Sequence, residues 1–199
     1  MRQGATGRLL NDPKGGSFWF DAGAVCLDFA HTGGEGPYAV FESLHRPADL
    51  ATWLASPPLA VVVTTPVSPA ELTAAKTLRQ AIWETAHARA DGRDLPTAAV
   101  AAINRAATAA PLRPALDAEG TTATWAPPVR ATQALSTMAR EMIDLLSGPL
   151  AARIRECASD NCPLVFVDTS RPGARRWCAM ERCGNRNKLQ ALRARRAGG

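Results

Sequence analysis

The sequence has no long run of apolar residues and no apolar leader. No apolar run approaches the roughly 18 residues that a membrane-spanning helix needs, so we expect no transmembrane segment. Residues 1–13 mix charge with glycine and lack the apolar stretch of a secretory signal. We therefore expect a protein of the reducing cytoplasm, where disulfides are rare.

The motifs of common enzymes are also missing. The sequence has no Ser-His-Asp ordering, no phosphate-binding loop and no Glu-x-x-His pair. Its three histidines, His31, His45 and His87, are too scattered along the chain to predict a metal site. We therefore expect no catalytic residues and no enzymatic activity.

Cysteine is present in a pattern that favours metal binding. Two pairs, each with four residues between its members, are separated by fifteen residues: Cys157, Cys162, Cys178 and Cys183. Zn²⁺ prefers a tetrahedron of such ligands, and four thiolates leave no coordination position for a catalytic water. We predict one structural zinc ion. Disulfides or free thiols are the alternative, and the fifth cysteine, Cys26, is expected to be a small core residue.

Charge is distributed unevenly over the 199 residues. Residues 153–199 carry eleven Arg or Lys against four Asp or Glu, a net of +7, whereas residues 1–152 carry twelve against fourteen, a net of −2. A zinc tetrathiolate subtracts two charges, which leaves the tail at about +5. A basic module joined to a nearly neutral one suggests that the tail alone has a polyanionic partner.

A terminal helix, expected over residues 180–196, carries much of this charge. At 100° per residue, four arginines fall within a sector of about 80°: Arg182, Arg186, Arg193 and Arg196. No acidic residue follows Glu181 to screen them. Arginines on one face can bridge to phosphates or bind guanine edges. The alternative is a basic helix that is merely solvated.

The rest of the chain fits a mixed α+β domain. Ser68, Pro69 and Glu71 form a capping box that starts the clearest helix. The Asp-Ala-Glu-Gly segment at 117–120 predicts a β-hairpin over 112–126. Residues 18–29 fit a strand followed by a second strand or a short helix, and residues 61–65 fit a short strand or buried connecting chain. Helices are expected at 47–55, 68–90, 96–109, 130–146 and 150–156.

The tail is expected to form a small treble-clef-like zinc finger. Residues 164–167 favour a strand, residues 168–173 a turn and residues 175–177 a returning strand. Gly184 suits a cramped backbone beside the metal, where a positive φ is often needed. We divide the chain into a flexible leader (1–16), a mixed helix and β-hairpin domain (17–150) and the zinc finger with its basic helix (151–199).

Two segments carry a family resemblance. Residues 176–188, with Cys-Gly-Asn-Arg at 183–186, and the preceding residues 166–170 resemble the CGNR zinc-finger family. Residues 26–32 (Cys-Leu-Asp-Phe-Ala-His-Thr) are similar to the motif that opens the accompanying ABATE domain, with Ala30-His31 in place of a Val-Asn pair. The resemblance implies a bacterial, cytoplasmic, stress-induced transcription regulator with a mixed α/β amino-terminal domain. It also implies that the four cysteines bind zinc and that the tail binds DNA.

The predicted nucleic-acid contacts all lie in the tail. Four of them, Arg176, Asn185, Arg186 and Lys188, follow from the resemblance. The full set adds basic residues of the expected second strand and helix: Arg175, Arg176, Arg182, Asn185, Arg186, Lys188, Arg193 and Arg196. DNA is the expected partner, and RNA or a ribosomal site is the alternative.

Three expectations concern the remaining groups. The amino-terminal domain is expected to sense a small-molecule effector or to form a homodimer. Asp28 could bind such an effector, although capping a helix or pairing with a nearby base is favoured. Trp177 is interpreted as packing over the zinc cluster, in preference to stacking on a base.

Overall fold

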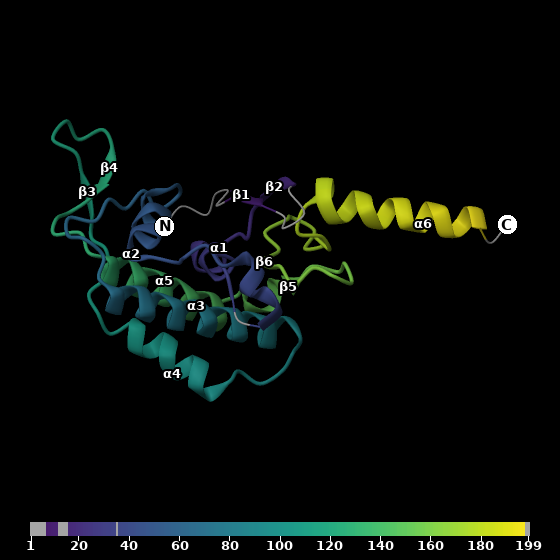
Figure 1. Ribbon diagram of the computed structural model, residues 1–199, viewed down its shortest axis with the longest axis horizontal. Coiled ribbons are helices and arrows are strands. Elements are labelled where there is room, and N and C mark those ends of the chain that lie inside the picture. The colour runs from purple at the N-terminus through teal and green to yellow at the C-terminus, as the bar shows by residue number, and fades with distance from the viewer. Residues whose placement is uncertain (1–6, 12–15, 35, 198–199) are drawn as a thin grey trace.

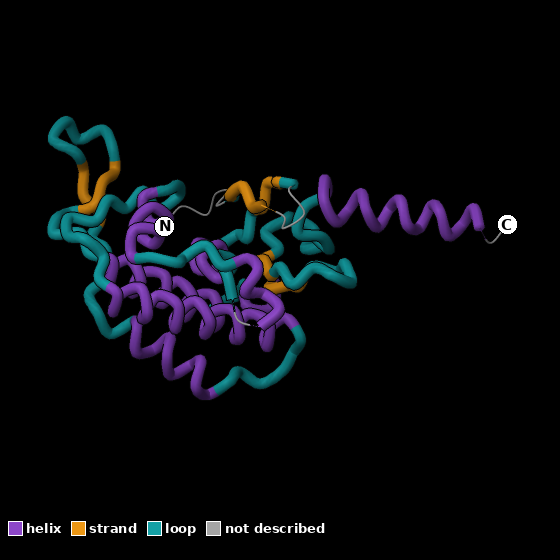
Figure 2. Tube along the Cα trace, viewed as in Figure 1, coloured by secondary structure: helices purple, strands orange, loops and turns teal. Residues whose placement is uncertain are grey.

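The computed structural model describes residues 7–11, 16–34 and 36–197. Within this part of the chain, helices form a body from which the basic helix α6 (Asn185–Ala197) projects at one end (Figure 1). The strands form three separate two-stranded antiparallel sheets, and the β3–β4 sheet projects from the helical body (Figure 2). The predicted α+β class is confirmed. No helix in the described ranges combines the length and apolarity that crossing a bilayer requires.

The helices of the body form close to where the sequence predicts them. The capping box of α3 is present, because Ser68 Oγ accepts from the Glu71 amide at 3.2 Å and Glu71 Oε2 accepts from the Ser68 amide at 2.8 Å. These bonds satisfy amide groups that have no partner inside the helix. The bounds of the four longer body helices are α2 Pro47–Ala55, α3 Pro69–Ala90, α4 Thr97–Ala106 and α5 Ala131–Ser147.

A short helix, α1 (Val25–Ala30), lies at the centre of the body. All six of its residues are buried, as expected for a helix that is apolar on nearly every side. It follows strand β2 (Ser17–Phe20), so the alternative of a strand followed by a short helix is confirmed. Cys26 has no exposed surface and is a core residue, as predicted.

The leader contains a strand that the sequence analysis missed. Residues Arg8–Asn11 form β1, which pairs antiparallel with β2 and places Arg8 opposite Phe20. The expectation of a flexible leader is therefore wrong for residues 8–11, while residues 1–6 and 12–15 lie outside the described residues. β1 alternates partly buried and exposed residues without a strong apolar pattern, so its pairing depends on β2 and on the contact of Arg8 with Trp53 at 4.1 Å.

The predicted hairpin and the connecting chain lie at the far end of the body from α6. Strands β3 (Pro114–Leu116) and β4 (Ala123–Trp125) pair antiparallel around the predicted turn, in which Gly120 has a φ of +68°. Residues 61–65 are connecting chain and form no strand. The Thr64 amide donates to the Val129 carbonyl at 2.8 Å, and neither residue belongs to a sheet.

Two elements that we expected in the tail differ in the structure. A helix was expected at 150–156, but Ala151–Arg153 is a single 3-10 turn and Ile154–Glu156 is strand β5. β5 pairs antiparallel with β6 (Val165–Val167), which buries Ile154 opposite Val167. The expected strand at 175–177 does not form either. In that segment the Arg176 carbonyl accepts from the Ala158 amide at 2.9 Å, and β6 pairs with β5.

The zinc-finger hairpin packs directly on the body. The Val167 amide donates to the Ala22 carbonyl at 2.8 Å, and the Trp19 amide donates to Glu181 Oε1 at 2.8 Å. Phe166 is fully buried in the same hydrophobic core as α1 and α3. The tail is therefore anchored to the amino-terminal domain by a continuous core as well as by hydrogen bonds.

Candidate metal centre and basic helix

Four sulfur atoms converge in the tail. The Sγ atoms of Cys157, Cys162, Cys178 and Cys183 all lie within 4.8 Å of one another, and all four side chains are buried. The Cys162 and Cys178 sulfurs are 3.6 Å apart. A tetrahedral zinc with Zn–S bonds of about 2.3 Å requires sulfur separations of about 3.8 Å. The donor set therefore fits one structural zinc ion, and the cluster is a zinc site.

The alternative of disulfides is wrong. All five cysteines are free, and 3.6 Å greatly exceeds the roughly 2.05 Å of a sulfur–sulfur bond. Cys157 and Cys162 lie in the loop between β5 and β6, and Cys183 lies in a wide helical turn, Met180–Gly184, that leads into α6. The first cysteine pair is thus held by a strand hairpin and the last cysteine by the start of the helix.

The thiols strongly influence one another's protonation. Hydrogen bonds from Cys162 and Cys178 lower the pKa of Cys157 to about 2. The same contact with Cys157 raises the pKa of Cys162 to about 12 and also raises the pKa of Cys178. One thiolate is therefore favoured, while its neighbours resist ionisation. A divalent cation offsets this repulsion, so zinc binding would release the remaining protons.

Two of the predicted DNA-binding arginines face the metal cluster. Arg182 Nη1 lies 3.4 Å from Cys162 Sγ, and Arg186 Nη2 lies 3.4 Å from Cys183 Sγ. Arg186 also donates to Ser159 Oγ at 2.9 Å. Groups that hydrogen-bond to metal ligands orient them and adjust their charge. The structure therefore brings Arg182 and Arg186 to the zinc site, where guanidinium charge compensates the thiolates.

Arg175 also hydrogen-bonds to the loop around the metal site. Its guanidinium donates to the carbonyls of Trp177 at 3.1 Å and Cys178 at 2.6 Å, and it lies 4.0 Å over the ring of Phe166. Arg176 is exposed and lies 5.0 Å over the ring of Trp177. The other predicted contact residues are all exposed on α6: Asn185, Lys188, Arg193 and Arg196.

Gly184 lies in a crowded position and does not adopt a positive φ. It is absent from the described glycines with positive φ. A Cβ at this position would lie 2.6 Å from Met180 Sδ and 3.3 Å from Trp177 Cδ1. The turn beside the metal therefore closes tightly over two side chains. Trp177 is half-buried against the core, which agrees with its interpretation as a packing residue.

Asp168 is a structural residue of the site that sequence reasoning missed. Its carboxylate accepts from the Ser170 amide at 3.0 Å and from the Arg175 amide at 2.9 Å. Burial raises the pKa of Asp168, but these hydrogen bonds outweigh burial and lower it overall. The residue lies in the segment that resembles the CGNR family, so that motif was the signal that could have found it.

His31 connects α1 to the zinc-finger hairpin. Its Nε2 lies 2.9 Å from the carbonyl oxygen of Val165, which can only accept, so Nε2 carries the proton. Burial lowers the pKa of His31 to about 4, so the ring is neutral at pH 7. This position, where the sequence departs from the family motif, is a junction between the two parts of the chain.

Two family models match the chain, one after the other. The model of the ABATE family, described as "Putative stress-induced transcription regulator", matches residues 23–149. The model of the CGNR zinc finger matches residues 153–196. Neither family is described as an enzyme. No curated protein matches the chain. Because the first match covers more than half of its length, this chain belongs to the ABATE family, and it ends in a CGNR zinc finger.

Proposed function

We propose that this protein is a transcription regulator whose zinc finger and helix α6 bind DNA. The observation that carries the proposal is the exposed cationic surface of α6, which projects away from the body (Figure 1). No acidic residue lies in α6, so its positive potential is unscreened. Lys and Arg contacts to phosphate supply most of the affinity of such an interface.

The exposed residues of α6 are the proposed contact set. Arg193 and Arg196 share a face with Leu189 and Leu192, which are 54% and 44% exposed. In a major groove, arginines on this face would bind phosphates or guanine edges, and the leucines would lie against thymine methyl groups. Arg176, Asn185 and Lys188 lie nearer the zinc site and would fix the position of the helix on the duplex.

Removing two of these charges tests the DNA interface. The double variant Arg193→Ala/Arg196→Ala should bind duplex DNA more weakly, and the slope of its logarithmic salt dependence should fall by about 0.9 for each phosphate that the variant no longer neutralises. The control is Arg89→Ala/Arg105→Ala, which removes two exposed arginines from the body. Fluorescence anisotropy over a range of salt concentrations measures both. Equal reductions of affinity in the two double variants would contradict a role for α6.

RNA is the second candidate because its phosphates present the same charge. Its recognition would rely on loops and 2′-hydroxyl groups, which a straight basic helix does not discriminate by charge alone. Competition between duplex DNA and a structured RNA of equal length separates the two candidates. If RNA displaces bound duplex DNA more readily than DNA displaces bound RNA at matched salt, RNA is the partner instead of DNA.

We also propose that residues 17–150 act as the sensing part and residues 151–199 as the binding part. The support is the packing of the zinc-finger hairpin on α1 and β2, through which a change in one part would reach the other.

A further inference from the structure

A cavity of about 710 Å³ lies where the amino-terminal domain meets the zinc finger. Pockets for small molecules commonly measure about 300–1,000 Å³. Strands β1 and β2, together with residues 28–33 and 40–43, supply most of the lining, and helix α2 adds Trp53. The zinc finger supplies Asn161, Pro163, Leu164 and Arg182. The cavity is therefore large enough for a small molecule that would contact both parts of the chain.

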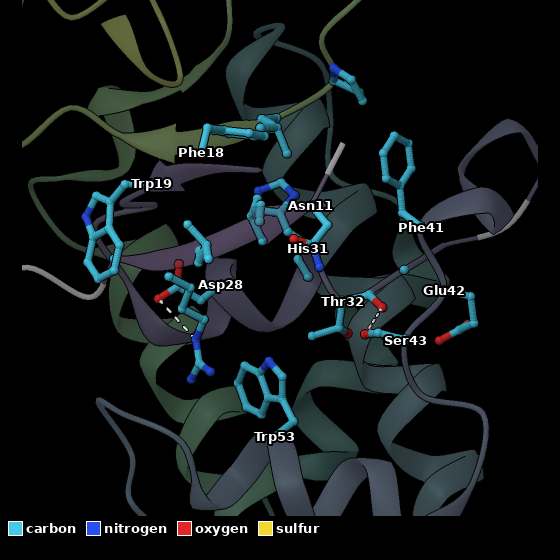
Figure 3. Close-up of a pocket in the computed structure, with 18 of the residues that line it drawn as sticks. Asn11, Phe18, Trp19, Asp28, His31, Thr32, Phe41, Glu42, Ser43 and Trp53 are labelled. Atoms are coloured by element: carbon cyan, nitrogen blue, oxygen red, sulfur yellow. Dashed lines mark hydrogen bonds and ion pairs between the residues drawn. The ribbon is translucent and has the colours of Figure 1, made fainter. Parts of the chain in front are cut away.

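Aromatic side chains give the cavity flat apolar walls. Figure 3 shows Phe18, Phe41 and Trp53 reaching it from different elements, with His31 and Thr32 between them. Trp19 and Trp83 also contribute to the lining. Broad aromatic surfaces with a few polar groups suit a planar organic molecule, because ring faces bury large apolar area in defined orientations.

Arg8 brings a buried positive charge to this lining. Its side chain is 12% exposed, and Nη1 donates to Ser56 Oγ at 2.6 Å while the guanidinium lies 4.1 Å over Trp53. Nε and Nη2 are buried and have no hydrogen-bond partner among the described residues. The carboxylate of Asp28 lies 4.0 Å away, which is beyond hydrogen-bonding distance. This is the ion pair with a nearby base that was favoured for Asp28, and Figure 3 shows it.

We propose that the cavity binds a small planar organic anion, a carboxylate in the simplest case, with Arg8 as its anchor. A carboxylate would accept from Nε and Nη2, which make no hydrogen bond with the described residues, and such charge-assisted bonds are roughly twice as strong as neutral ones. Glu42 lines the same cavity, but Arg79 binds it through two bonds of 2.8 and 2.7 Å, and Lys76 lies 3.7 Å away. Its charge is therefore already neutralised.

Burial supports the choice of an anion. It lowers the pKa of Arg8, an effect that Asp28 opposes only in part. A second negative partner would stabilise the charged form of this buried guanidinium.

The same ligand would influence the zinc finger through Arg182. This residue lines the cavity, lies 4.5 Å over the ring of Phe18 and donates to Cys162 Sγ at 3.4 Å. The preceding residue, Glu181, accepts from the Trp19 amide. An anion bound to Arg8 in β1 would thus act, through β2, on the turn from which α6 begins. This regulatory part of the proposal rests on the proposed function, whereas ligand binding itself does not.

Isothermal titration with a matched pair of probes tests the site. The probes are 2-naphthoate and its neutral analogue 2-naphthamide, added to the zinc-loaded full chain without nucleic acid. We expect the carboxylate to bind at least about tenfold more tightly, the factor that corresponds to 1.4 kcal/mol. Equal binding of the two probes would overturn the proposal. So would the absence of binding by either probe at about 10 mM, a concentration at which even weak fragments bind.

Variants locate the binding. Arg8→Met keeps an apolar side chain over Trp53 but loses the charge, so the affinity for 2-naphthoate should fall at least about tenfold. Arg8→Lys keeps the charge but loses the forked geometry, so its affinity should be intermediate. Arg89→Met is the control for loss of an exposed arginine. Far-ultraviolet circular dichroism checks the fold of each variant. Unchanged affinity in Arg8→Met would remove Arg8 as the anchor.

The regulatory part has its own readouts. Saturating 2-naphthoate should change duplex affinity by about 5–150-fold, the usual range of coupling between two sites. Hydrogen exchange of residues 159–164 and 180–184, with and without the probe, should change even when no nucleic acid is present. No change in either measurement would overturn the coupling. Failure of the protein to bind DNA both with and without the probe would reject the proposed function and leave the titration unaffected.

Discussion

At the scale of single residues, the tail arginines divide into two groups. Arg182 and Arg186 bond to cysteine sulfurs, although Arg186 is also exposed, whereas Arg193 and Arg196 are exposed farther along α6. The sequence pattern predicted all four on one helical face because it assumed a uniform 100° per residue. The wide turn Met180–Gly184 breaks that regularity at its start, so Arg182 is directed to Cys162.

This division predicts different effects on metal affinity. Arg182→Ala/Arg186→Ala should weaken zinc binding by about 10–100-fold, as is typical when partners of metal ligands are removed. Competition with a chromophoric chelator measures this change. Arg193→Ala/Arg196→Ala is the control and should bind zinc as the wild type does. Identical zinc affinity in all three proteins would show that the hydrogen bonds to sulfur contribute nothing.

His31 predicts a pH dependence of stability. Its pKa in the folded protein is lowered to about 4, below its ordinary value of 6.5, because the partly buried ring is desolvated by the surrounding protein. The unfolded chain then binds more protons than the folded chain between these values. The contribution of His31 is therefore fully present above pH 6.5 and is lost as the pH falls towards 4.

Urea unfolding of the wild type and of His31→Gln, at several pH values from about 7.5 to about 4.5, tests this sign. We expect a shallower decline of the unfolding free energy in the variant, because glutamine does not titrate. His45→Gln is the control, since His45 is exposed. A parallel decline in all three proteins would contradict the buried neutral state of His31.

At the scale of elements, local signals predicted the helices and missed two strands. Helix α3 begins at a capping box that is complete within four residues, and α2 begins with Pro47 after an extended residue. Such signals need no distant partner. Strands β1 and β5 are short, and each depends on a paired strand elsewhere in the chain. The pattern of residues 150–156 alone therefore favoured a helix, and pairing with β6 outweighed that preference.

The capping box of α3 should make a measurable contribution to the unfolding free energy. Ser68→Ala should lower the unfolding free energy by about 1 kcal/mol, because the Glu71 amide loses its acceptor. Thr73→Ala removes an exposed hydroxyl from the same helix and should have a much smaller effect. Thermal and urea unfolding measure both variants. A larger decrease in Thr73→Ala would mean that the start of α3 contributes little to stability.

At the scale of the whole molecule, the sequence predicted the zinc ligands correctly but not how the tail is attached. The cysteine spacing identified the cluster because short-range pairs close a metal site without distant chain contacts. The cavity and the role of Arg8 depend on the meeting of β1, α2 and the zinc finger, segments far apart in the chain. No local pattern encodes that arrangement.

Metal removal should therefore affect the two parts of the chain unequally. With zinc chelated, the loop at 157–164 and the turn at 180–184 should lose hydrogen-exchange protection, since the thiolates no longer share a cation. Helices α3 and α5 should stay protected because apolar side chains of the body make up most of the core around them. Hydrogen exchange with mass spectrometry resolves these segments. Uniform loss of protection would mean that the ion stabilises the whole fold.

The projection of α6 gives the molecule a lever. Its thirteen residues span about 20 Å at about 1.5 Å per residue, and its base adjoins the turn that holds Cys183. A tilt of about 10° at that base would move the far end by about 3 Å, close to the separation of successive base pairs along a duplex. A sub-ångström rearrangement near the start of α6 would thus be enough to shift its far end by about one base-pair step along the duplex.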